Sequence, residues 1–484
     1  MDGGHIAHAI KWIALTSSVF TLLFNLSQAQ KKLFCYYGSE AQYRTYPGKF
    51  SPNNIDVTLC THVIFAFADI ENTRLVPQNW NDLGPTGLYA QVTHLKARNP
   101  SLRVLLAVGG WVAGYRPFYD VVESDTSMSD FAANVIVYLR TAGMDGLDMD
   151  WEFPGVRGSP PEDKYQFTRL MQTLYTQFSD EAIRSKRERL ILTLASAVGI
   201  FFIDLGYETT EIHKYVDYML LMTYNFHGGW DNFTAHHSTI FPSQYDQGED
   251  TWLCQNWAVN FWISQGVPRS KILLGLATYG MSFTLEDARD NGLNAPVLGN
   301  GAGGPYTQQE GILAFYEICE NLQRNGWTNY WIADQQVPYA TRGDQWVGYD
   351  DVNSIRIKAD RMINGYGLAG AFVWSVELDD FNGHCGGGTY PLLRTINDVI
   401  RPMDRSGRSL PVSQRVPPRL PGSVYPSTEC ASLGTGSHRD TRNCRWYKLC
   451  TLNRGEYKQE IYRCPEGLSY NSTIRQCDVS PFCV

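Results

Sequence analysis

The chain has 484 residues, of which 43% are hydrophobic, and it carries a formal net charge of −8. This length exceeds one ordinary domain, although a single barrel can take up about 250 residues or more. The negative charge argues against a nucleic-acid partner.

The first 29 residues have the pattern of a secretory signal. A single basic residue, Lys11, precedes an apolar run from Trp12 to Leu26, and residues 27–29 place Ser and Ala at the −3 and −1 positions of a cleavage site. A membrane anchor is the alternative, but the run is short for the roughly 20 residues that a span needs. We therefore expect a secreted, extracellular protein that is not held in a membrane, with candidate glycosylation sites at Asn232 and Asn471.

Eight short apolar runs recur along residues 30–402, separated by helix-like stretches. They are rich in Val, Ile and Leu without clean alternation, which is typical of parallel strands buried on both faces. Strands and helices in this order predict an α/β fold, a (β/α)8 TIM barrel, whose active site lies at the carboxyl ends of the strands. The runs are Leu33–Tyr37, His62–Ala68, Arg103–Gly109, Gly146–Glu152, Leu190–Ala197, Tyr218–Tyr224, Ile272–Ala277 and Gly370–Val376.

The fourth run contains the most informative segment, Asp145-Gly-Leu-Asp148-Met-Asp150-Trp-Glu152-Phe-Pro. Alternation along a strand places Asp148, Asp150 and Glu152 on one face, with successive members about 6–7 Å apart. Their charges repel, so at least one proton should be retained, and a protonated carboxyl is what acid catalysis of glycoside cleavage requires. A solvated strand face or a calcium site is the alternative. A calcium loop would need Gly and Asn turn chemistry, whereas the intervening residues here are bulky and apolar.

Residues 145–154 resemble the DxxDxDxE signature of family 18 glycoside hydrolases, the chitinases and their lectin relatives, and the resemblance extends from about Leu33 to Pro402. It implies hydrolysis with retention, in which the acetamide oxygen of the substrate replaces an enzyme nucleophile. No cofactor and no metal are implied. The resemblance makes Glu152 the acid/base, has Asp150 orient the acetamide and stabilise the oxazolinium intermediate, has Asp148 share a proton with Asp150, has Asp145 support the strand end, and has Tyr224 bond the acetamide oxygen.

The resemblance also implies a set of substrate-binding residues. Trp111 matches a position on the non-reducing side, Trp80 and Trp230 match leaving-side aromatics, and Trp374 would form the floor under the reacting sugar. A single aromatic is more often core than subsite, and we place Tyr36 in the barrel core. The expected set comprises Asp145, Phe67, Trp80, Trp111, Met222, Asn225, Trp230, Tyr279 and Trp374.

Three positions depart from the family pattern. Glu40 stands where the family usually has Trp, so a stacking platform distant from the cleavage point is missing. Asn225 replaces an Asp and Met281 replaces an Arg. These departures bear on affinity, preferred length and pH dependence, but they leave the catalytic acid in place.

The interval from about 281 to 361 is rich in aromatic residues, and we interpret it as an inserted α+β subdomain that forms one wall of a groove, as the resemblance also implies. The resemblance pairs Cys35 with Cys60 and Cys319 with Cys385. Cys254 is then, by subtraction, a free thiol.

Residues 403–427 contain five prolines and four arginines, which is typical of a semi-rigid linker. Residues 428–484 then hold six cysteines spaced C-x13-C-x5-C-x13-C-x12-C-x5-C. This pattern resembles the peritrophin-type chitin-binding module, with a Cys450–Cys464 bridge expected; a generic disulfide knot that binds protein is the alternative. The aromatic residues expected to bind chitin are Trp446, Tyr447, Tyr457 and Tyr470.

The sequence therefore predicts a secreted, monomeric endo-chitinase that acts on chitin and chito-oligosaccharides. The main alternative is a chitin-binding lectin that does not hydrolyse, but lectin relatives generally lack the acid or another carboxylate of the set, and all four are present here. A hydrolase of the chitobiose core of N-glycans is a further alternative, against which the chitin-binding tail argues.

Overall fold

The computed structural model describes residues 30–402 and, beyond them, five strands between residues 436 and 478. Contacts divide the chain into two compact units, Met1–Val416 and Pro417–Val484. The expected signal at 1–29 and the linker at 403–427 lie outside the described residues. Within the described part, no helix combines the length and apolar character needed to cross a bilayer.

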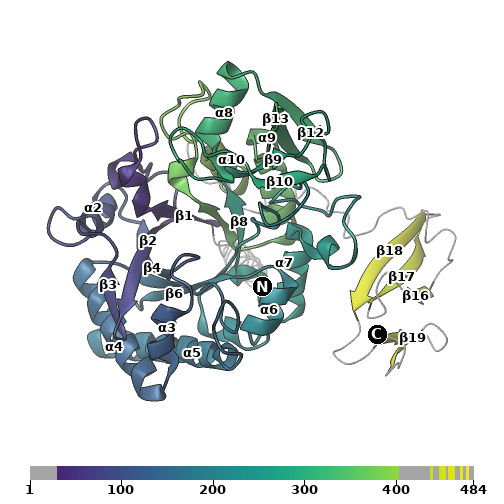
Figure 1. The fold of residues 1–484 in the computed structure, drawn as a ribbon. Helices are drawn as coiled ribbons and strands as arrows, with labels where there is room; N and C mark the ends of the chain where they lie inside the picture. The colour runs from purple at the N-terminus through teal and green to yellow at the C-terminus, as the bar shows by residue number, and fades with distance from the viewer. Residues whose placement is uncertain are drawn as a thin grey trace, which may run out of the picture. The chain divides into compact units, whose positions relative to one another are not determined.

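Eight parallel strands close into a barrel at the centre of the first unit (Figure 1). Every strand pairs with its two neighbours, and β1 pairs with both β15 and β2, which closes the ring. All eight predicted runs are strands of this ring, so the predicted (β/α)8 barrel is confirmed. In ring order the strands are β1 (Lys32–Gly38), β2 (His62–Glu71), β4 (Arg103–Gly109), β5 (Gly146–Asp150), β6 (Ile191–Ser196), β7 (Tyr218–Leu221), β8 (Ile272–Ala277) and β15 (Gly370–Trp374).

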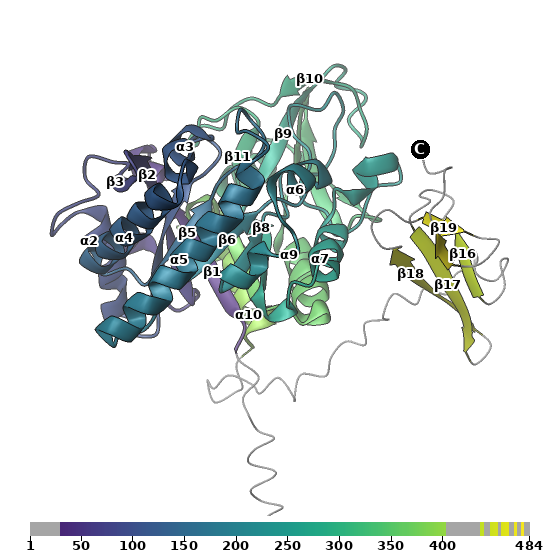
Figure 2. The ribbon, with the colours of Figure 1, turned by 90° about the horizontal axis from the view of Figure 1, so that it is seen from below.

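Helices cover the outside of the barrel, and Figure 2 shows α4 and α5 side by side along it. The longer helices are amphipathic: α4 starts at an N-cap serine, Ser124, turns Phe131, Val135 and Leu139 to the core, and ends at Gly143, whose φ of 70° suits glycine. The helices are α2 (Leu88–His94), α3 (Arg116–Val122), α4 (Asp125–Ala142), α5 (Asp163–Ser185), α6 (Ile200–Gly206), α7 (Gln255–Ser264), α8 (Phe315–Arg324), α9 (Val352–Lys358) and α10 (Pro391–Ile400).

Short helical turns lie in the connections, and β3 (Arg74–Pro77) forms a hairpin with β2. The turns are η1 (Ser39–Tyr43), η2 (Pro52–Asn54), η3 (Leu95–Ala97), η4 (Ile212–Tyr215), η5 (Gly248–Trp252), η6 (Arg269–Lys271), the π-helical η7 (Ala359–Asn364) and η8 (Val376–Leu378).

A second, antiparallel sheet lies between β8 and β15 and, with α8, forms an α+β subdomain (Figure 1, top). Its aromatic residues pack face to face across neighbouring strands, with Tyr330 on Tyr339 at 4.9 Å and Tyr339 on Trp346 at 5.2 Å between ring centroids. The strands are β9 (Tyr279–Leu285), β10 (Val297–Asn300), β11 (Ile312–Ala314), β12 (Thr328–Ile332), β13 (Val337–Arg342) and β14 (Gln345–Gly348).

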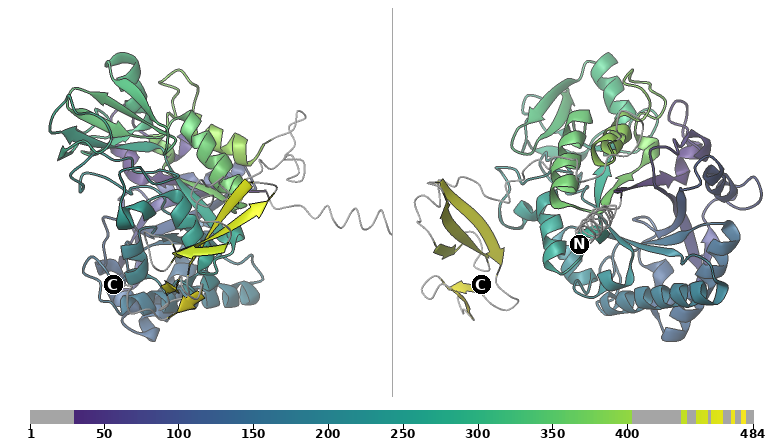
Figure 3. Two further views of the ribbon diagram at one scale, coloured as in Figure 1. Left: turned by 90° about the vertical axis from the view of Figure 1, so that its right-hand side faces the viewer. Right: turned by 180° about the vertical axis from the view of Figure 1, so that it is seen from behind.

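The second unit is described by its strands alone (yellow in Figure 3). Three of them form an antiparallel sheet and two form a separate ladder. They are β16 (Gly436–Arg439), β17 (Trp446–Asn453), β18 (Glu456–Arg463), β19 (Ser469–Asn471) and β20 (Gln476–Asp478). The predicted chitin-binding residues Trp446, Tyr447, Tyr457 and Tyr470 fall on these strands, but their side chains, and the expected Cys450–Cys464 bridge, lie outside the described residues.

Candidate functional site

Two carboxylates project from β5, and a third follows where the strand ends. Asp148 and Asp150 belong to β5, and Glu152 comes two residues later. The intervening side chains point the other way: Trp151 stacks on Phe118 at 4.6 Å and meets the edge of Phe167 at 5.4 Å, which fixes it against α3 and α5. Alternation thus directs one face of the segment to the helices and the carboxylates to the barrel interior.

Asp148 lies at the bottom of the row and is completely buried. Its carboxylate accepts a 2.6 Å hydrogen bond from the Tyr36 hydroxyl and another from the Thr193 hydroxyl. Burial raises the pKa of Asp148 to about 6, while these two donors oppose the rise because they stabilise the charged form. Asp148 is therefore the member of the row best equipped to carry a negative charge.

Asp150, the middle carboxyl, is also buried, and within the described structure its Oδ1 has no hydrogen-bond partner. Burial raises its pKa well above the ordinary value, and the charges of Glu152 and Asp148 on either side raise it further. Asp150 therefore retains a proton readily, and its unpartnered oxygen can receive an N–H group from a ligand.

Glu152 stands at the barrel mouth. Burial raises its pKa to about 7, against the opposing effects of the Arg157 charge and of a hydrogen bond from the Trp111 backbone N–H. Arg157 lies over the Trp111 ring, 3.6 Å from its centroid, and donates to the carbonyl oxygens of Trp111 (2.9 Å) and Glu152 (2.8 Å). Glu152 is thus a carboxyl that keeps its proton near neutral pH and is fixed to the neighbouring loop.

Two tyrosines that follow β7 and β8 interact with the carboxylate row. Tyr224 follows β7 and is nearly buried; burial raises its pKa well above the ordinary value, with further contributions from Tyr279 and the carboxylates, so it remains a neutral hydroxyl donor. Tyr279, at the start of β9, donates a 2.6 Å hydrogen bond to Oδ1 of Asn225. Asn225 has a φ of 55°, a left-handed conformation that asparagine tolerates better than most residues.

Apolar rings converge at the mouth beside the carboxylates. The Trp374 ring, at the end of β15, lies 5.2 Å from that of Tyr36 and 5.8 Å from that of Phe67. Met222, after β7, is half-buried against the same core. The structure therefore brings the predicted residues Phe67, Met222, Tyr224 and Trp374 together around Asp148 and Asp150.

Three of the predicted tryptophans are largely exposed: Trp80 by 88%, Trp230 by 63% and Trp111 by 56%. Trp80 follows the β2–β3 hairpin, whereas Trp230 follows β7. Three strands separate β2 from β7 in either direction around the ring. The two residues therefore follow strands on opposite sides of the ring, and their assignment as leaving-side aromatics stays a prediction.

Asp145 does not belong to the substrate-binding set in which the sequence placed it. It precedes β5, at the amino end of the strand, so the length of β5 separates it from the mouth. Its carboxylate forms a 2.9 Å ion pair with Lys96 and accepts a 2.8 Å hydrogen bond from the Val104 backbone N–H. Asp145 anchors the start of the strand, which agrees with its supporting role but not with contact to a ligand.

The sequence missed three residues that the structure places at the site. Tyr36 was assigned to the core; it is buried there, but its hydroxyl also bonds Asp148. Thr193 on β6 is the second donor to Asp148, and Arg157 joins Glu152 to Trp111. The one signal available in advance was a polar side chain within an apolar strand, as at Thr193.

The disulfides Cys35–Cys60 and Cys319–Cys385 are present, and Cys254 is a buried free thiol in the described part of the chain, so these three predictions are confirmed. Two of the residues that depart from the family pattern differ in exposure. Glu40 is exposed, whereas Met281 is only 5% exposed. Nowhere in residues 30–402 do three His, Cys, Asp or Glu side chains form a metal-binding group.

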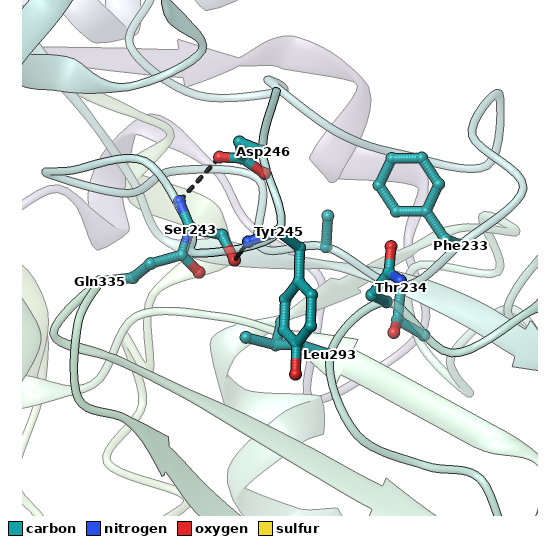
Figure 4. Close-up of a pocket in the computed structure, with 9 residues that line it drawn as sticks. Phe233, Thr234, Ser243, Tyr245, Asp246, Leu293 and Gln335 are labelled. Atoms are coloured by element: carbon teal, nitrogen blue, oxygen red, sulfur yellow. Dashed lines mark hydrogen bonds between the residues drawn. The ribbon is translucent and has the colours of Figure 1, made fainter. Parts of the chain in front are cut away.

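A small pocket lies apart from the carboxylate row (Figure 4). Two of its polar side chains are partnered within the pocket: the Ser243 backbone N–H donates to Asp246 at 2.7 Å, and that of Tyr245 donates to the Ser243 hydroxyl at 3.2 Å. It contains none of the predicted site residues and offers no competing reactive group. The lining residues are Phe233, Thr234, Ala235, Ser243, Tyr245, Asp246, Leu293, Asn294 and Gln335.

A parallel barrel with a protonated carboxyl at its mouth, two supporting aspartates beneath it and aromatic rings around it has the architecture of a glycoside hydrolase. Comparison with known proteins identifies the kind. The chain belongs to the glycosyl hydrolases of family 18, whose model matches residues 32–379, and the chitin-binding peritrophin-A domain matches residues 430–482. Both resemblances expected from the sequence are thus confirmed.

Individual relatives cover most of the chain. Mouse chitotriosidase-1 is 40% identical over 469 residues, which are 95% of this chain and 98% of that protein. Human YKL-39, described as a pseudo-chitinase with retained chitooligosaccharide binding, is 38% identical with a TM-score of 0.73, covering 76% of this chain and 99% of its own. The group IV chitinase of Ostrinia furnacalis in complex with allosamidin is 36% identical with a TM-score of 0.73, covering 76% and 98%.

Proposed function

We propose that this protein is a secreted endo-chitinase, which hydrolyses the β-1,4 bonds between N-acetylglucosamine units with retention of configuration and with Glu152 as its acid/base. The observation that carries the proposal is that three carboxyl groups in a row lie in unequal environments. Asp148 is supplied with two donors, Asp150 has none, and the pKa of Glu152 is raised to about 7. A proton is therefore available at the mouth, where a glycosidic oxygen would lie.

In the first step, the carbonyl oxygen of the substrate's acetamide attacks the anomeric carbon while Glu152 gives its proton to the departing glycosidic oxygen. The bond to the leaving chain breaks and a cyclic oxazolinium ion forms. Asp150, with its unpartnered Oδ1, accepts the acetamide N–H and balances the positive charge of the ring. Tyr224, held as a neutral hydroxyl, donates to the acetamide oxygen before it attacks.

In the second step, Glu152 is a carboxylate and removes a proton from water, which attacks the anomeric carbon on the face that the leaving chain vacated. The oxazolinium opens and the acetamide is regenerated, so two inversions give net retention. Asp148 and Asp150 share one proton throughout. Tyr36 and Thr193 stabilise the charge on Asp148 while the proton is on Asp150, and the proton passes to Asp148 when Asp150 balances the positive charge of the oxazolinium.

Glu152→Gln tests the proposal. The amide is nearly isosteric but has no acidic proton, so turnover of chito-oligosaccharides should fall by at least about 10²–10⁴-fold, the usual contribution of general acid catalysis. Binding of the oligosaccharide should persist. Product release by the variant at more than about a tenth of the parental rate would refute the assignment of Glu152.

The alternative is a chitin-binding lectin, and the similarity to YKL-39, a pseudo-chitinase, supports it. The same assay separates the two, because a lectin shows no turnover even in the parent protein while it still binds oligosaccharides. The complete carboxylate row favours the enzyme.

Further elements of the proposal concern the setting. The disulfides Cys35–Cys60 and Cys319–Cys385 suit an oxidising, extracellular compartment. The peritrophin-A domain favours insoluble chitin as the physiological partner. We propose that the protein acts as a monomer, free of membrane and of nucleic acid, in keeping with its net charge of −8.

A further inference from the structure

Glu40 extends an unpaired carboxylate from the rim of the barrel mouth. It belongs to η1, which follows the carboxyl end of β1 directly, and its side chain is exposed. Within the described part of the chain, no cation and no hydrogen-bond donor is paired with it, whereas the carboxylates of Asp56 and Asp145, elsewhere on the barrel, are each paired with a basic side chain. A carboxylate left free at this place is available to a ligand.

Two exposed aromatic residues belong to the same part of the rim as Glu40. Side-chain hydrogen bonds join the segment 39–43 to the segment 79–81. Asn79 donates to Ser39 (3.0 Å) and accepts from Tyr43 (3.3 Å), and Asn81 donates to Gln42 at 2.8 Å. Trp80, in the second segment, is 88% exposed, and Tyr43, in the first, is 54% exposed. This part of the rim therefore offers two exposed aromatic rings and one unpaired carboxylate.

The local field at this rim is negative. Asp82, buried and bonded to Asn79, has a raised pKa, chiefly through burial and in part through the charge of Glu40. The nearest cation on the same segment, Arg44, is directed elsewhere: it donates to the carbonyl oxygen of Glu377 and its charge acts on that residue. A cationic group on a ligand would therefore neutralise the negative charge of Glu40, which Arg44 does not.

The rim is continuous with the reaction centre. β1 lies between β15 and β2 in the ring, and Tyr36 on β1 contacts both Trp374 and Asp148. The next residues along β1, Gly38 and then η1, lead outward from that contact. A polysaccharide chain that lies over Trp374 and continues across the β1 sector reaches Glu40 and Trp80.

We propose that Glu40 makes the protein selective for sugar units that carry a free amine, and hence for partially deacetylated chitin. A glucosamine unit presents a protonated primary amine where N-acetylglucosamine presents a neutral amide, and both have the same ring faces for stacking. Trp80 and Tyr43 can stack on either unit, but only the ammonium group forms an ion pair with the Glu40 carboxylate. The inference deepens the proposed function and rests on it for the identity of the polymer.

Binding to the full-length Glu152→Gln protein tests this inference without requiring turnover. Dissociation constants are measured by calorimetry at mildly acidic pH for two soluble oligosaccharides of equal length, one fully acetylated and one partially deacetylated. The measured quantity is the ratio of the two constants, in which any contribution of the chitin-binding module common to both variants cancels. Glu40→Gln should reduce the preference for the deacetylated oligomer by about two- to fivefold, the range for an exposed charge pair.

Controls make the outcome specific. Glu249→Gln removes an equal charge from an exposed glutamate in η5, which follows β7 and is separated from β1 by β8 and β15 in the ring, and should leave the ratio unchanged. Added salt should weaken the preference of the protein with Glu40 and leave that of Glu40→Gln unaffected. Glu40→Trp should favour the acetylated oligomer through stacking alone.

The outcomes for the two proposals are distinguishable. If the parent enzyme hydrolyses neither oligomer, the proposed function fails, yet the binding ratio still decides the role of Glu40. An equal ratio for Glu40 and Glu40→Gln, or an equal loss with Glu249→Gln, would overturn the inference even in an active chitinase.

Discussion

The hydroxyl oxygen of Tyr36 lies 2.6 Å from Oδ2 of Asp148, a hydrogen bond that crosses the barrel interior from β1 to β5. The two strands are not neighbours, since β2 and β4 lie between them in the ring. Tyr36 also packs its ring against Phe372 and Trp374. One side chain thus connects the carboxylate at the bottom of the row with the aromatic floor of the mouth.

Tyr36→Phe should therefore shift the pH dependence of catalysis. The Tyr36 donor stabilises ionised Asp148 and opposes the rise in its pKa that burial causes. Without this donor the pKa rises further, so Asp148 becomes protonated at a higher pH. A hydrogen bond to a charged group contributes about 1.5–3 kcal/mol, and one pKa unit is about 1.4 kcal/mol. We expect the acidic limb of the kcat profile to move up by about one unit or more.

The measurement is a pH–rate profile on a soluble chito-oligosaccharide. Thr193→Val removes the other donor to Asp148 and should move the same limb in the same direction. An acidic limb that stays in place in both variants would show that the ionisation of Asp148 does not govern the rate.

The contrast between Tyr36 and the eight strands shows what a sequence reveals. Apolar runs mark parallel strands because both faces of each strand are covered, and that property is local. The bond from Tyr36 to Asp148 joins residues 112 positions apart and depends on how the strands are staggered in the closed ring. The boundary of the insertion is hidden for a similar reason: a single residue, Thr278, lies between the end of β8 and the start of β9, so no turn signal separates barrel from subdomain.

The position of Asp145 and the course of the loop that carries Trp80 have the same explanation. Asp145 shares a motif with Asp148 and Asp150, but a strand has two ends, and spacing alone does not tell which end meets the ligand. Trp80 stands on a loop whose course is set by the bonds between Asn79, Ser39 and Tyr43. These side-chain contacts join segments about 40 residues apart in the chain and leave no periodic pattern.

Arg157→Gln should raise the pH at which activity is lost on the alkaline side. The positive charge of Arg157 lowers the pKa of Glu152, so its removal raises that pKa and Glu152 remains a proton donor to higher pH. Because Arg157 is exposed, the charge is screened, and we expect a shift of the basic limb below about one unit.

Arg157→Lys is the matched control. Lysine keeps the charge but loses the planar stack on Trp111 and the paired bonds to the carbonyl oxygens of Trp111 and Glu152. The basic limb should then stay near its parental position while KM for long oligomers rises. Equal pH profiles for the parent and the glutamine variant would exclude a role for Arg157 in tuning Glu152.

Removal of residues 428–484 should impair hydrolysis of insoluble chitin far more than cleavage of soluble oligomers. The first unit is compact without the tail and contains every residue of the carboxylate row. The tail supplies affinity for the polymer surface, and the linker converts this affinity into a high local concentration of the catalytic unit. Rates on colloidal chitin and on a soluble oligomer are compared for the full chain and the truncated one, and equal losses on both substrates would contradict the prediction.

Asn225 and Met281 stand where the family has an Asp and an Arg, and we predict that the two charges were lost together. The structure places both beside the turn that follows β7. Asn225 accepts from Tyr279 at 2.6 Å, and a Cβ atom on Gly228 would come within 2.7 Å of Cε of Met281. Met281 is buried, so an arginine there would need a partner. An unpaired buried charge costs about 3–5 kcal/mol, whereas replacing both members of a pair by neutral groups can be nearly neutral.

The single variants should therefore be worse than the double. Asn225→Asp introduces a carboxylate near Glu152; like charge raises the pKa of Glu152, so the basic limb of the pH–rate profile moves to higher pH. Met281→Arg alone should lower the free energy of unfolding by about 3–5 kcal/mol. In the double variant the arginine has a counter-charge, which should restore part of the stability and reverse part of the pH shift. Unfolding midpoints and pH–rate profiles of the four proteins form a double-mutant cycle, and additivity within about 0.5 kcal/mol would show that positions 225 and 281 do not interact.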